Sequence, residues 1–274
     1  GGGRAPPPAA PASLECPMTT APSEFDRWVL RPAPRSAPAL RLICVPFAGS
    51  GPAAFQGWSG LLPDSVEPWL LRLPGRESRF REEPRTDVAM VVKEAVTVLG
   101  PALDGRPYAL FGHSLGALIA FELARELRRS YGREPAHLSV SARAAPHLPL
   151  RHAVVHRLPD DLFLDALDVR FNAIPPAIRD EPQMRALYLP VLRADVTLLE
   201  TYAYTPEAPL DCPITAYGGT EDPEFRGQEL EAWSRHTAAS HRLRMFPGGH
   251  FFLNSQRAGL VSDLTDDLYR AMIP

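Results

Sequence analysis

The segment YALFGHSLGALIAFELARELRR, residues 108–129, joins a short apolar run to a longer amphipathic one. Its first four residues have the pattern of a buried strand, and residues 115–129 have that of a helix. Between them, Gly112, Ser114 and Gly116 match G-x-S-x-G, a pattern typical of a sharp strand-to-helix turn that lifts the serine side chain out of a sheet. Glycine on either side lets the backbone pack where a Cβ would clash. The segment therefore predicts a nucleophilic serine at a helix N-terminus, where peptide dipoles favour developing negative charge.

Short apolar runs alternate with helical periodicity from about residue 39 to the end of the chain. The strands are expected at 40–45, 66–73, 136–142, 213–217 and 242–246, and the helices at 53–62, 86–103, 226–236 and 255–272. This alternation predicts an α/β fold, a mostly parallel central sheet flanked by helices. A helical block at about 159–204 breaks the alternation, so we expect it to form a helical lid insertion over the sheet.

Residues 1–20 differ from the rest of the chain because they are rich in Gly, Pro and Ala and carry no hydrophobic period. We expect a disordered tail there, with the part ahead of Met18 a remnant of an expression tag. Residues 21–274 are then expected to form one domain, including the lid.

The composition limits the classes of partner. The 274 residues have a formal net charge of -3 and are 45% hydrophobic, which gives no reason to expect nucleic acid or a membrane as partner. The three cysteines have no metal-like spacing, and we find no secretory signal, so we expect neither a disulfide framework nor a metal site. No apolar stretch approaches the roughly 20 residues of a membrane span. We therefore expect a cytoplasmic protein that is a monomer.

The base that activates Ser114 should be a histidine late in the chain. The G-x-S-x-G turn is typical of the α/β-hydrolase fold, whose catalytic residues follow the order Ser, Asp or Glu, His. Among eight histidines, His250 stands in FPGGHFF, residues 246–252, after an expected strand and a Pro-Gly-Gly turn. This context places its imidazole on a loop at the carboxyl edge of the sheet. His250 is therefore the predicted base.

The acid of the triad should follow the preceding strand. That strand leads into GGTEDP, residues 218–223, where Asp222 can orient His250 and stabilise its imidazolium form. Glu221 and Glu224 are neighbours that could replace it. Asp222 could instead be a helix N-cap, since a helix follows. We predict Asp222 as the acid.

An oxyanion hole needs two backbone N–H groups. One belongs to Leu115, directly after the nucleophile, and the other to the loop after the strand at 40–45. We predict Ala48 as the second donor, with Phe47 as the alternative, although the glycines of that loop could serve only to form a tight turn. The side chains expected to line the substrate chamber are Phe47, His113, Phe171 and Phe251.

Eight short segments carry a resemblance to a known family. They are VPFAGS at 45–50, LPGRE at 73–77, FGHSLG at 111–116, LPDD at 158–161, LPVLRAD at 189–195, ETY at 200–202, GGTED at 218–222 and FPGGHFF at 246–252. Together, over about residues 40 to 270, they resemble the type II thioesterases, the discrete editing enzymes of polyketide and nonribosomal peptide pathways. The lid sequence LPVLRADVTLLETYAYTP is more telling than the serine motif, because generic lipases do not share it.

The resemblance implies hydrolysis of a thioester that joins an acyl group to the phosphopantetheine arm of an acyl or peptidyl carrier protein domain. Ser114, Asp222 and His250 carry over as the triad, and no metal or organic cofactor is implied, since the substrate brings its own phosphopantetheine.

Two segments depart from the family. Many members read His-Ala-Gly-Gly where this chain has FAGS at 47–50, and RFNAIPP at 170–176 replaces a more glycine-rich stretch. The chamber wall becomes more apolar, and the acyl-chain preference stays open.

Two groups of arginines could contact an acidic carrier protein. Local salt bridges are the alternative interpretation, and Glu122, Glu126 and Arg129 have the helical spacing for them. The groups are Arg72, Arg76, Arg79, Arg81 and Arg85, and Arg125, Arg128, Arg129 and Arg133.

Three other functions agree with parts of the sequence. A small-molecule esterase or lipase would have the same triad, since fold and triad do not set the substrate. An acyltransferase would share GHSLG, which malonyl transacylases also have at their nucleophile, but it would lack the Asp partner and have a different fold order. A silent scaffold that only binds is disfavoured by the intact triad.

Overall fold

The computed structural model describes residues 1–3, 22–172 and 174–272, and a seven-stranded sheet forms its centre. The tail predicted for residues 1–20 lies almost wholly outside the described residues. The strands are β1 (Val29–Leu30), β2 (Leu40–Val45), β3 (Val66–Leu71), β4 (Tyr108–His113), β5 (His137–Ser141), β6 (Ile214–Gly219) and β7 (His241–Phe246). Their order is β1-β3-β2-β4-β5-β6-β7, and every pairing is parallel except that of β1 with β3.

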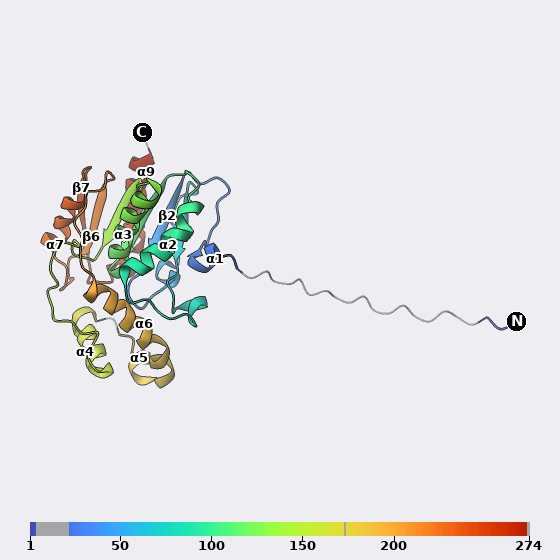
Figure 1. The fold of residues 1–274 in the computed structure, drawn as a ribbon, viewed down its shortest axis with the longest axis horizontal. Coiled ribbons are helices and arrows are strands. Elements are labelled where there is room, and N and C mark those ends of the chain that lie inside the picture. The colour runs from blue at the N-terminus through green and yellow to red at the C-terminus, as the bar shows by residue number, and fades with distance from the viewer. Residues whose placement is uncertain (4–21, 173, 273–274) are drawn as a thin grey trace.

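Helices cover both faces of this sheet (Figure 1). The helices α2 (Val88–Ala102) and α3 (Leu115–Tyr131) lie on one face, and α9 (Arg257–Met272) lies on the other. The remaining helices are α1 (Glu24–Trp28), α4 (Asp160–Phe171), α5 (Pro176–Asp180), α6 (Pro182–Thr201), α7 (Gly227–Glu231) and α8 (Phe252–Ser255). The mostly parallel α/β fold that the sequence predicts is confirmed.

The alternation of side chains along each central strand divides the core into two parts. In β2, Ile43 and Val45 pack with residues of α2 and α3, whereas Leu42 and Cys44 pack with residues of α9. All six residues of β2 are buried, as expected for a parallel strand with helices on both sides. The short, wholly apolar runs in the sequence are therefore the central strands.

Some local details differ from expectation. The helix expected at 53–62 is instead two 3-10 turns, because Gly57 between them has a left-handed backbone with a φ of 84°. The short elements α1 and β1 are not predicted by periodicity at all. Pro68 is tolerated inside β3 because β1 pairs only with Leu70 and Leu71, so that this part of β3 is at the edge of the described sheet.

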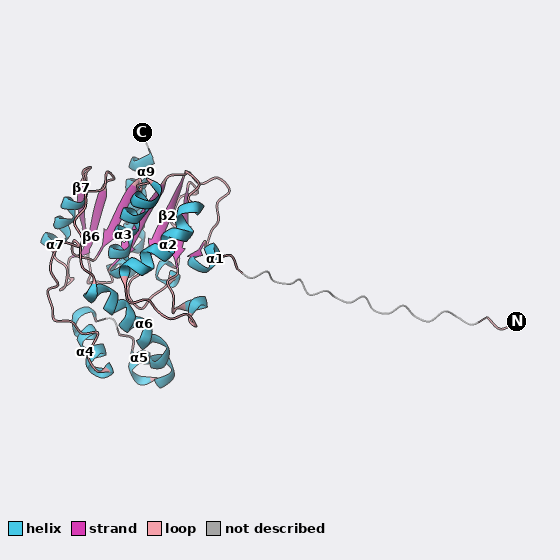
Figure 2. Cartoon of the chain, viewed as in Figure 1, coloured by secondary structure: helices cyan, strands magenta, loops and turns pink. Residues whose placement is uncertain are grey.

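The lid consists of α4, α5 and α6 and lies over one end of the sheet (Figure 2). It has a small core of its own, in which Phe163, Leu164 and Leu167 of α4 pack with Ile178 and Leu189. This end of the sheet is also where β4 ends, directly before Ser114, and the pocket beside that serine is lined partly by lid residues. The helical block that breaks the strand–helix alternation is thus an insertion that covers the pocket beside Ser114.

Candidate active site

Ser114 lies at the turn between β4 and α3. Its φ of 55° and ψ of -115° are strained for a non-glycine residue and turn the strand sharply into the helix. Its N–H donates to the carbonyl of Ser141, at the end of β5, at 2.8 Å. The serine side chain makes no capping hydrogen bond to the helix. The turn that G-x-S-x-G predicts is present.

Gly112 and Gly116 leave room for this turn to close. A Cβ on Gly112 would lie 2.0 Å from the carbonyl oxygen of Gly116, and one on Gly116 would lie 2.1 Å from that of Val45. Both contacts are with backbone, which cannot move aside as a flexible side chain can. These two positions therefore accept only glycine.

We expect Gly112→Ala to lower the free energy of unfolding by about 3 kcal/mol, because the added methyl group overpacks a rigid turn. Gly227→Ala is the matched control, since its Cβ would meet only Leu243, at 3.9 Å. Urea unfolding of both variants measures the difference. Equal midpoints for the two variants would show that the turn relaxes around the methyl group.

His250 and Asp222 form a buried pair. Nδ1 of His250 donates to Oδ2 of Asp222 at 2.8 Å, and Oδ1 of Asp222 accepts the N–H of Glu224 at 2.9 Å. The two side chains are 2% and 0% exposed. Because an ionised carboxylate can only accept, it fixes the imidazole proton on Nδ1 and leaves Nε2 free to accept another. This is the arrangement that a general base needs.

Two adjacent loops hold the pair in place. The loop with Asp222 follows β6 and the loop with His250 follows β7, so both lie at the same edge of the sheet. The N–H of Thr220 donates to the carbonyl of Phe246 at 2.9 Å. Gly219 has no space for a side chain, since a Cβ there would lie 2.4 Å from two carbonyl oxygens of the second loop. The glycines of both motifs thus bring the loops together.

The two alternative acids lie elsewhere. Glu221 is exposed, and Glu224 pairs with His152 at 3.2 Å. Of the three neighbouring carboxylates, the structure brings only Asp222 against His250 within the described residues.

Ser114 and His250 open onto one pocket between the sheet and the lid. Its volume is about 190 Å³. Three of the predicted chamber residues line it, namely Phe47, Phe171 and Phe251. Sequence reasoning missed the contributions of the lid helices, among them Leu167, Ile178, Leu192, Val196 and Leu199. The pocket walls are therefore mainly apolar.

Aromatic rings surround the imidazole of His250. The ring centroids of Phe171, Phe251 and Phe225 lie 4.6, 4.9 and 5.7 Å from that of the histidine. These rings exclude water from most of the imidazole, and a low local dielectric strengthens its attraction to the Asp222 carboxylate.

His113 corrects one prediction, since it does not line the pocket. Its side chain is fully buried, and Nδ1 lies 2.9 Å from the hydroxyl of Ser141. As the last residue of β4 it follows the strand alternation into the interior, where it packs against Phe252, whereas the strained turn redirects the next residue to the pocket. Burial holds the pKa of His113 well below its ordinary value, so the ring is neutral.

The two predicted oxyanion donors lie beside the serine. Leu115 is the first residue of α3, and Ala48 contributes to the same pocket wall as Ser114. The structure thus brings both predicted positions to the nucleophile.

A buried ion pair holds the loop that contains Ala48. The N–H of Gly49 donates to Oδ2 of Asp195, in lid helix α6, at 2.7 Å. Arg76 donates to both oxygens of that carboxylate at 2.8 Å and to the carbonyl of Ser50 at 2.9 Å. Asp195 is 0% and Arg76 is 6% exposed. Sequence reasoning missed this contact, although both residues lie in segments that carry the family resemblance.

A family model for the thioesterase domain matches residues 40–268. This chain belongs to the thioesterase family. The thioesterase is 37% identical to the gramicidin S biosynthesis protein GrsT of Aneurinibacillus migulanus, over 92% of its own length and 98% of that protein. It is thus a hydrolase that acts on thioesters.

Two solved structures resemble the thioesterase closely. One is RedJ, a thioesterase from the prodiginine biosynthetic pathway in Streptomyces coelicolor, with a TM-score of 0.79, 35% identity, and coverage of 94% of this chain and 97% of RedJ. The other is the type II thioesterase BorB from the borrelidin biosynthetic cluster, with a TM-score of 0.79, 33% identity, and coverage of 91% and 100%. The predicted resemblance to type II thioesterases is confirmed.

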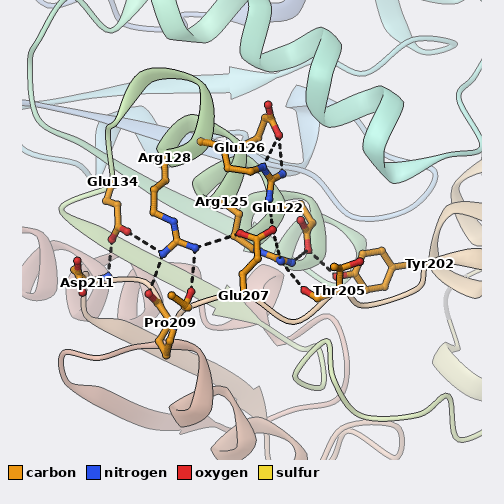
Figure 3. Close-up of polar contacts among 12 residues, drawn as sticks. Glu122, Arg125, Glu126, Arg128, Glu134, Tyr202, Thr205, Glu207, Pro209 and Asp211 are labelled. Atoms are coloured by element: carbon orange, nitrogen blue, oxygen red, sulfur yellow. Dashed lines mark hydrogen bonds and ion pairs between the residues drawn. The ribbon is translucent and has the colours of Figure 1, made fainter.

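Most of the arginines that could face a partner of the thioesterase are held by its own carboxylates. Arg125 pairs with Glu122 at 2.6 Å, and Arg128 pairs with Glu134 at 3.2 Å. Both also reach Glu207, in the segment after α6, and so join α3 to the chain that leaves the lid (Figure 3). Carboxylates close in sequence also hold Arg72, Arg79, Arg85 and Arg129. Arg76 pairs with the distant Asp195. The alternative of local salt bridges is confirmed for six of these arginines, and Arg76 is held by a salt bridge within the protein that is not local.

In 1–3, 22–172 and 174–272, no group of three or more His, Cys, Asp or Glu side chains is arranged to hold a metal ion. Over the same ranges, each helix is too short or too polar to span a bilayer.

Proposed function

We propose that this thioesterase hydrolyses acyl thioesters on the phosphopantetheine arm of carrier protein domains. Ser114 would be the nucleophile, His250 the base and Asp222 the residue that orients it. One observation supports this most directly: the strained serine and the histidine of the buried histidine–aspartate pair line a single, mainly apolar pocket beneath the lid. An apolar pocket suits the acyl chain, and the reacting carbonyl would lie beside Ser114 and His250.

In the first half-reaction, the Ser114 hydroxyl attacks the thioester carbonyl while Nε2 of His250 takes its proton. The negative charge that develops on the carbonyl oxygen is stabilised by the N–H groups of Leu115 and Ala48. Asp222 stabilises the imidazolium that forms. The thiolate of the pantetheine arm then leaves and takes the proton from His250, which leaves an acyl group on Ser114.

In the second half-reaction, water attacks the acyl-enzyme with His250 again as base. The same two N–H groups hold the second oxyanion, and the collapse of this intermediate releases the acid and restores the Ser114 hydroxyl. Every proton in this scheme moves through His250, so we propose that no metal or organic cofactor takes part.

The names of the relatives support a carrier-bound substrate. GrsT is described as a gramicidin S biosynthesis protein, and RedJ and BorB as thioesterases of a biosynthetic pathway and a biosynthetic cluster. We propose that this enzyme likewise serves a polyketide or nonribosomal peptide synthase by removing aberrant acyl groups from its carriers. It would act in the cytoplasm as a monomer.

Deacylation of a loaded carrier tests this function. A carrier protein is charged with acetyl-, propionyl- and longer acyl-phosphopantetheine, and the loss of each acyl group is followed by intact-protein mass. A p-nitrophenyl ester of the same acyl group is run alongside, and Ser114→Ala provides the background rate. We expect the wild type to clear acyl carriers with a higher kcat/KM than the free ester, because the carrier and its arm supply binding energy that the ester lacks.

The esterase alternative gives the opposite order. It would hydrolyse the free ester while the carriers stay loaded, since it would share the triad but have no site for the arm. That result would overturn the carrier-bound substrate and keep the hydrolase.

A further inference from the structure

A second cavity adjoins the pocket that contains Ser114. Its volume is about 270 Å³, and it lies between the segment that follows β5 and the lid helices α4 and α6. Four residues line both spaces, namely Leu167, Phe171, Val196 and Leu199. A group in the second cavity would therefore lie one layer of side chains away from an acyl chain in the first.

The backbone at the rim of this cavity is fixed and strained. Ala142, directly after β5, has a φ of 49°, a left-handed conformation that costs a non-glycine residue about 1–3 kcal/mol. Its N–H donates to the carbonyl of Tyr217 at 2.8 Å, and the carbonyl of Arg143 accepts Nε1 of Trp233 at 2.8 Å. These bonds hold Arg143 where its side chain lines the cavity.

The guanidinium of Arg143 has no countercharge in the part of the chain that the structure describes. Its ring contact is with Phe225, 5.7 Å from the guanidinium carbon to the centroid. The buried arginines of the described residues are paired, as Arg76 is with Asp195 and Arg125 with Glu122. Arg143 is half-buried, and the loss of part of its water lowers its pKa to about 10. A half-buried cation that lines a cavity without a carboxylate partner is available to an anionic ligand.

The carboxylates that line the cavity are already engaged. Glu200 accepts the N–H groups of Val155 and His156 and lies 2.6 Å from Nδ1 of His156. Glu224 pairs with His152 at 3.2 Å. Of the two further arginines in the lining, Arg151 pairs with Glu229 at 3.3 Å, and Arg170 donates to the carbonyl of Ala153 at 3.0 Å. Arg143 and Arg170 are therefore the lining arginines without a carboxylate partner among the described residues, and an anion would complement them.

We propose that this cavity is a subsite for an anionic oxygen group of the substrate, with Arg143 as its charged contact. The proposal rests on the proposed function, because it assumes an acyl-pantetheine substrate. The anion is either the carboxylate of a dicarboxylic acyl group or the phosphate of the pantetheine arm. A planar guanidinium suits both, since it can donate two parallel hydrogen bonds to either.

Binding of pantetheine probes to the Ser114→Ala variant, which lacks the nucleophile and so does not hydrolyse them, distinguishes the carboxylate from the phosphate. Calorimetry compares pantetheine with 4′-phosphopantetheine, and acetyl-pantetheine with malonyl-pantetheine. We expect one anionic probe to bind at least about 10-fold more tightly than its neutral counterpart, as a charge-assisted contact allows. When Arg143→Gln is added, the anionic probe should bind at most about 2-fold more tightly than its neutral counterpart. The affinity for the neutral probes should not change.

Arg106→Gln is the matched control, since Arg106 is 43% exposed and lies outside both cavities. It should keep the full ratio, and Arg143→Lys should keep part of it. If Arg143→Gln weakens the binding of phosphopantetheine alone, the phosphate is the anion that Arg143 contacts. If it weakens the binding of malonyl-pantetheine alone, the carboxylate is that anion. If neither ratio depends on Arg143, or if neutral and anionic probes weaken equally, there is no anion subsite here.

Thermal unfolding distinguishes a ligand contact from a structural one. Arg143→Gln removes an unpaired cation, so the melting temperature should stay the same or rise. A fall of more than about 4 °C would assign this arginine to the fold. Failure of the proposed function would appear separately, as intact acyl carriers in the turnover assay with wild-type Ser114.

Discussion

Asparagine in place of Asp222 should lower kcat for deacylation by about 10⁴-fold. The amide has nearly the same shape as the carboxylate and can keep the 2.9 Å contact with the N–H of Glu224. It can also offer its NH₂ group to Nδ1 of His250, which would move the imidazole proton to Nε2. In that tautomer the histidine cannot take the proton of Ser114, and no negative charge stabilises the imidazolium.

Glu221→Gln is the matched control for this variant. Glu221 is the adjacent residue, carries the same charge and is exposed, so its loss should change kcat by less than about 2-fold. Single-turnover deacylation of an acyl carrier, followed by intact mass, measures both variants, with Ser114→Ala as the floor. A large loss with Glu221→Gln and a small one with Asp222→Asn would transfer the role of the acid to Glu221.

Replacing Asp195 by leucine should lower the free energy of unfolding by about 3–5 kcal/mol, the range for breaking a buried ion pair from one side. Arg76 is 6% exposed and would lose both of its 2.8 Å hydrogen bonds to that carboxylate. The N–H of Gly49 would lose its acceptor as well. Urea unfolding measures the stability, and kcat on an acyl carrier reports the effect on the loop of Ala48.

The double variant Arg76→Met with Asp195→Leu separates stability from catalysis. It leaves no unpaired charge, so most of the lost stability should return. We expect kcat to stay low, because the N–H of Gly49 still has no acceptor and the neighbouring Ala48 is no longer held in place. Recovery of both stability and kcat would mean that the ion pair serves the fold alone.

A surface pair provides the matched control for the ion-pair variants. Arg179 and Asp165 lie 2.6 Å apart in the lid, with side chains 32% and 59% exposed. Asp165→Leu should change the free energy of unfolding by less than about 1 kcal/mol, because water already screens this pair. The contrast tests burial as the cause of the larger effect at Asp195.

Local sequence rules were sufficient to predict six of the seven strands of the sheet, all except β1, and the three residues proposed as the triad. Ser114 follows β4 directly, and Asp222 and His250 lie on the short loops after β6 and β7. The carboxyl ends of parallel strands lie at one edge of a sheet. The glycines around them limit the turns to a few conformations. The left-handed backbone at Gly57 interrupts the helix expected at 53–62, so that the segment forms two short turns instead.

Local sequence rules did not predict the direction in which the side chain of His113 points. His113 precedes the serine and was expected in the substrate chamber, yet the strand alternation buries it completely. The strained backbone at Ser114 sends two consecutive side chains to different places, and that strain depends on the close approach of β2 and α3.

The sequence by itself determined the fold class, the strained turn at Ser114 and the family, because these depend on short-range patterns of strands, glycines and loops. Only the tertiary structure decided that Arg76 meets Asp195 across 119 residues, and that Arg143 faces a cavity without a countercharge. Such contacts depend on how a lid helix packs against loops from distant parts of the chain. No local periodicity encodes that packing, since it is set by the shapes and charges of both surfaces together.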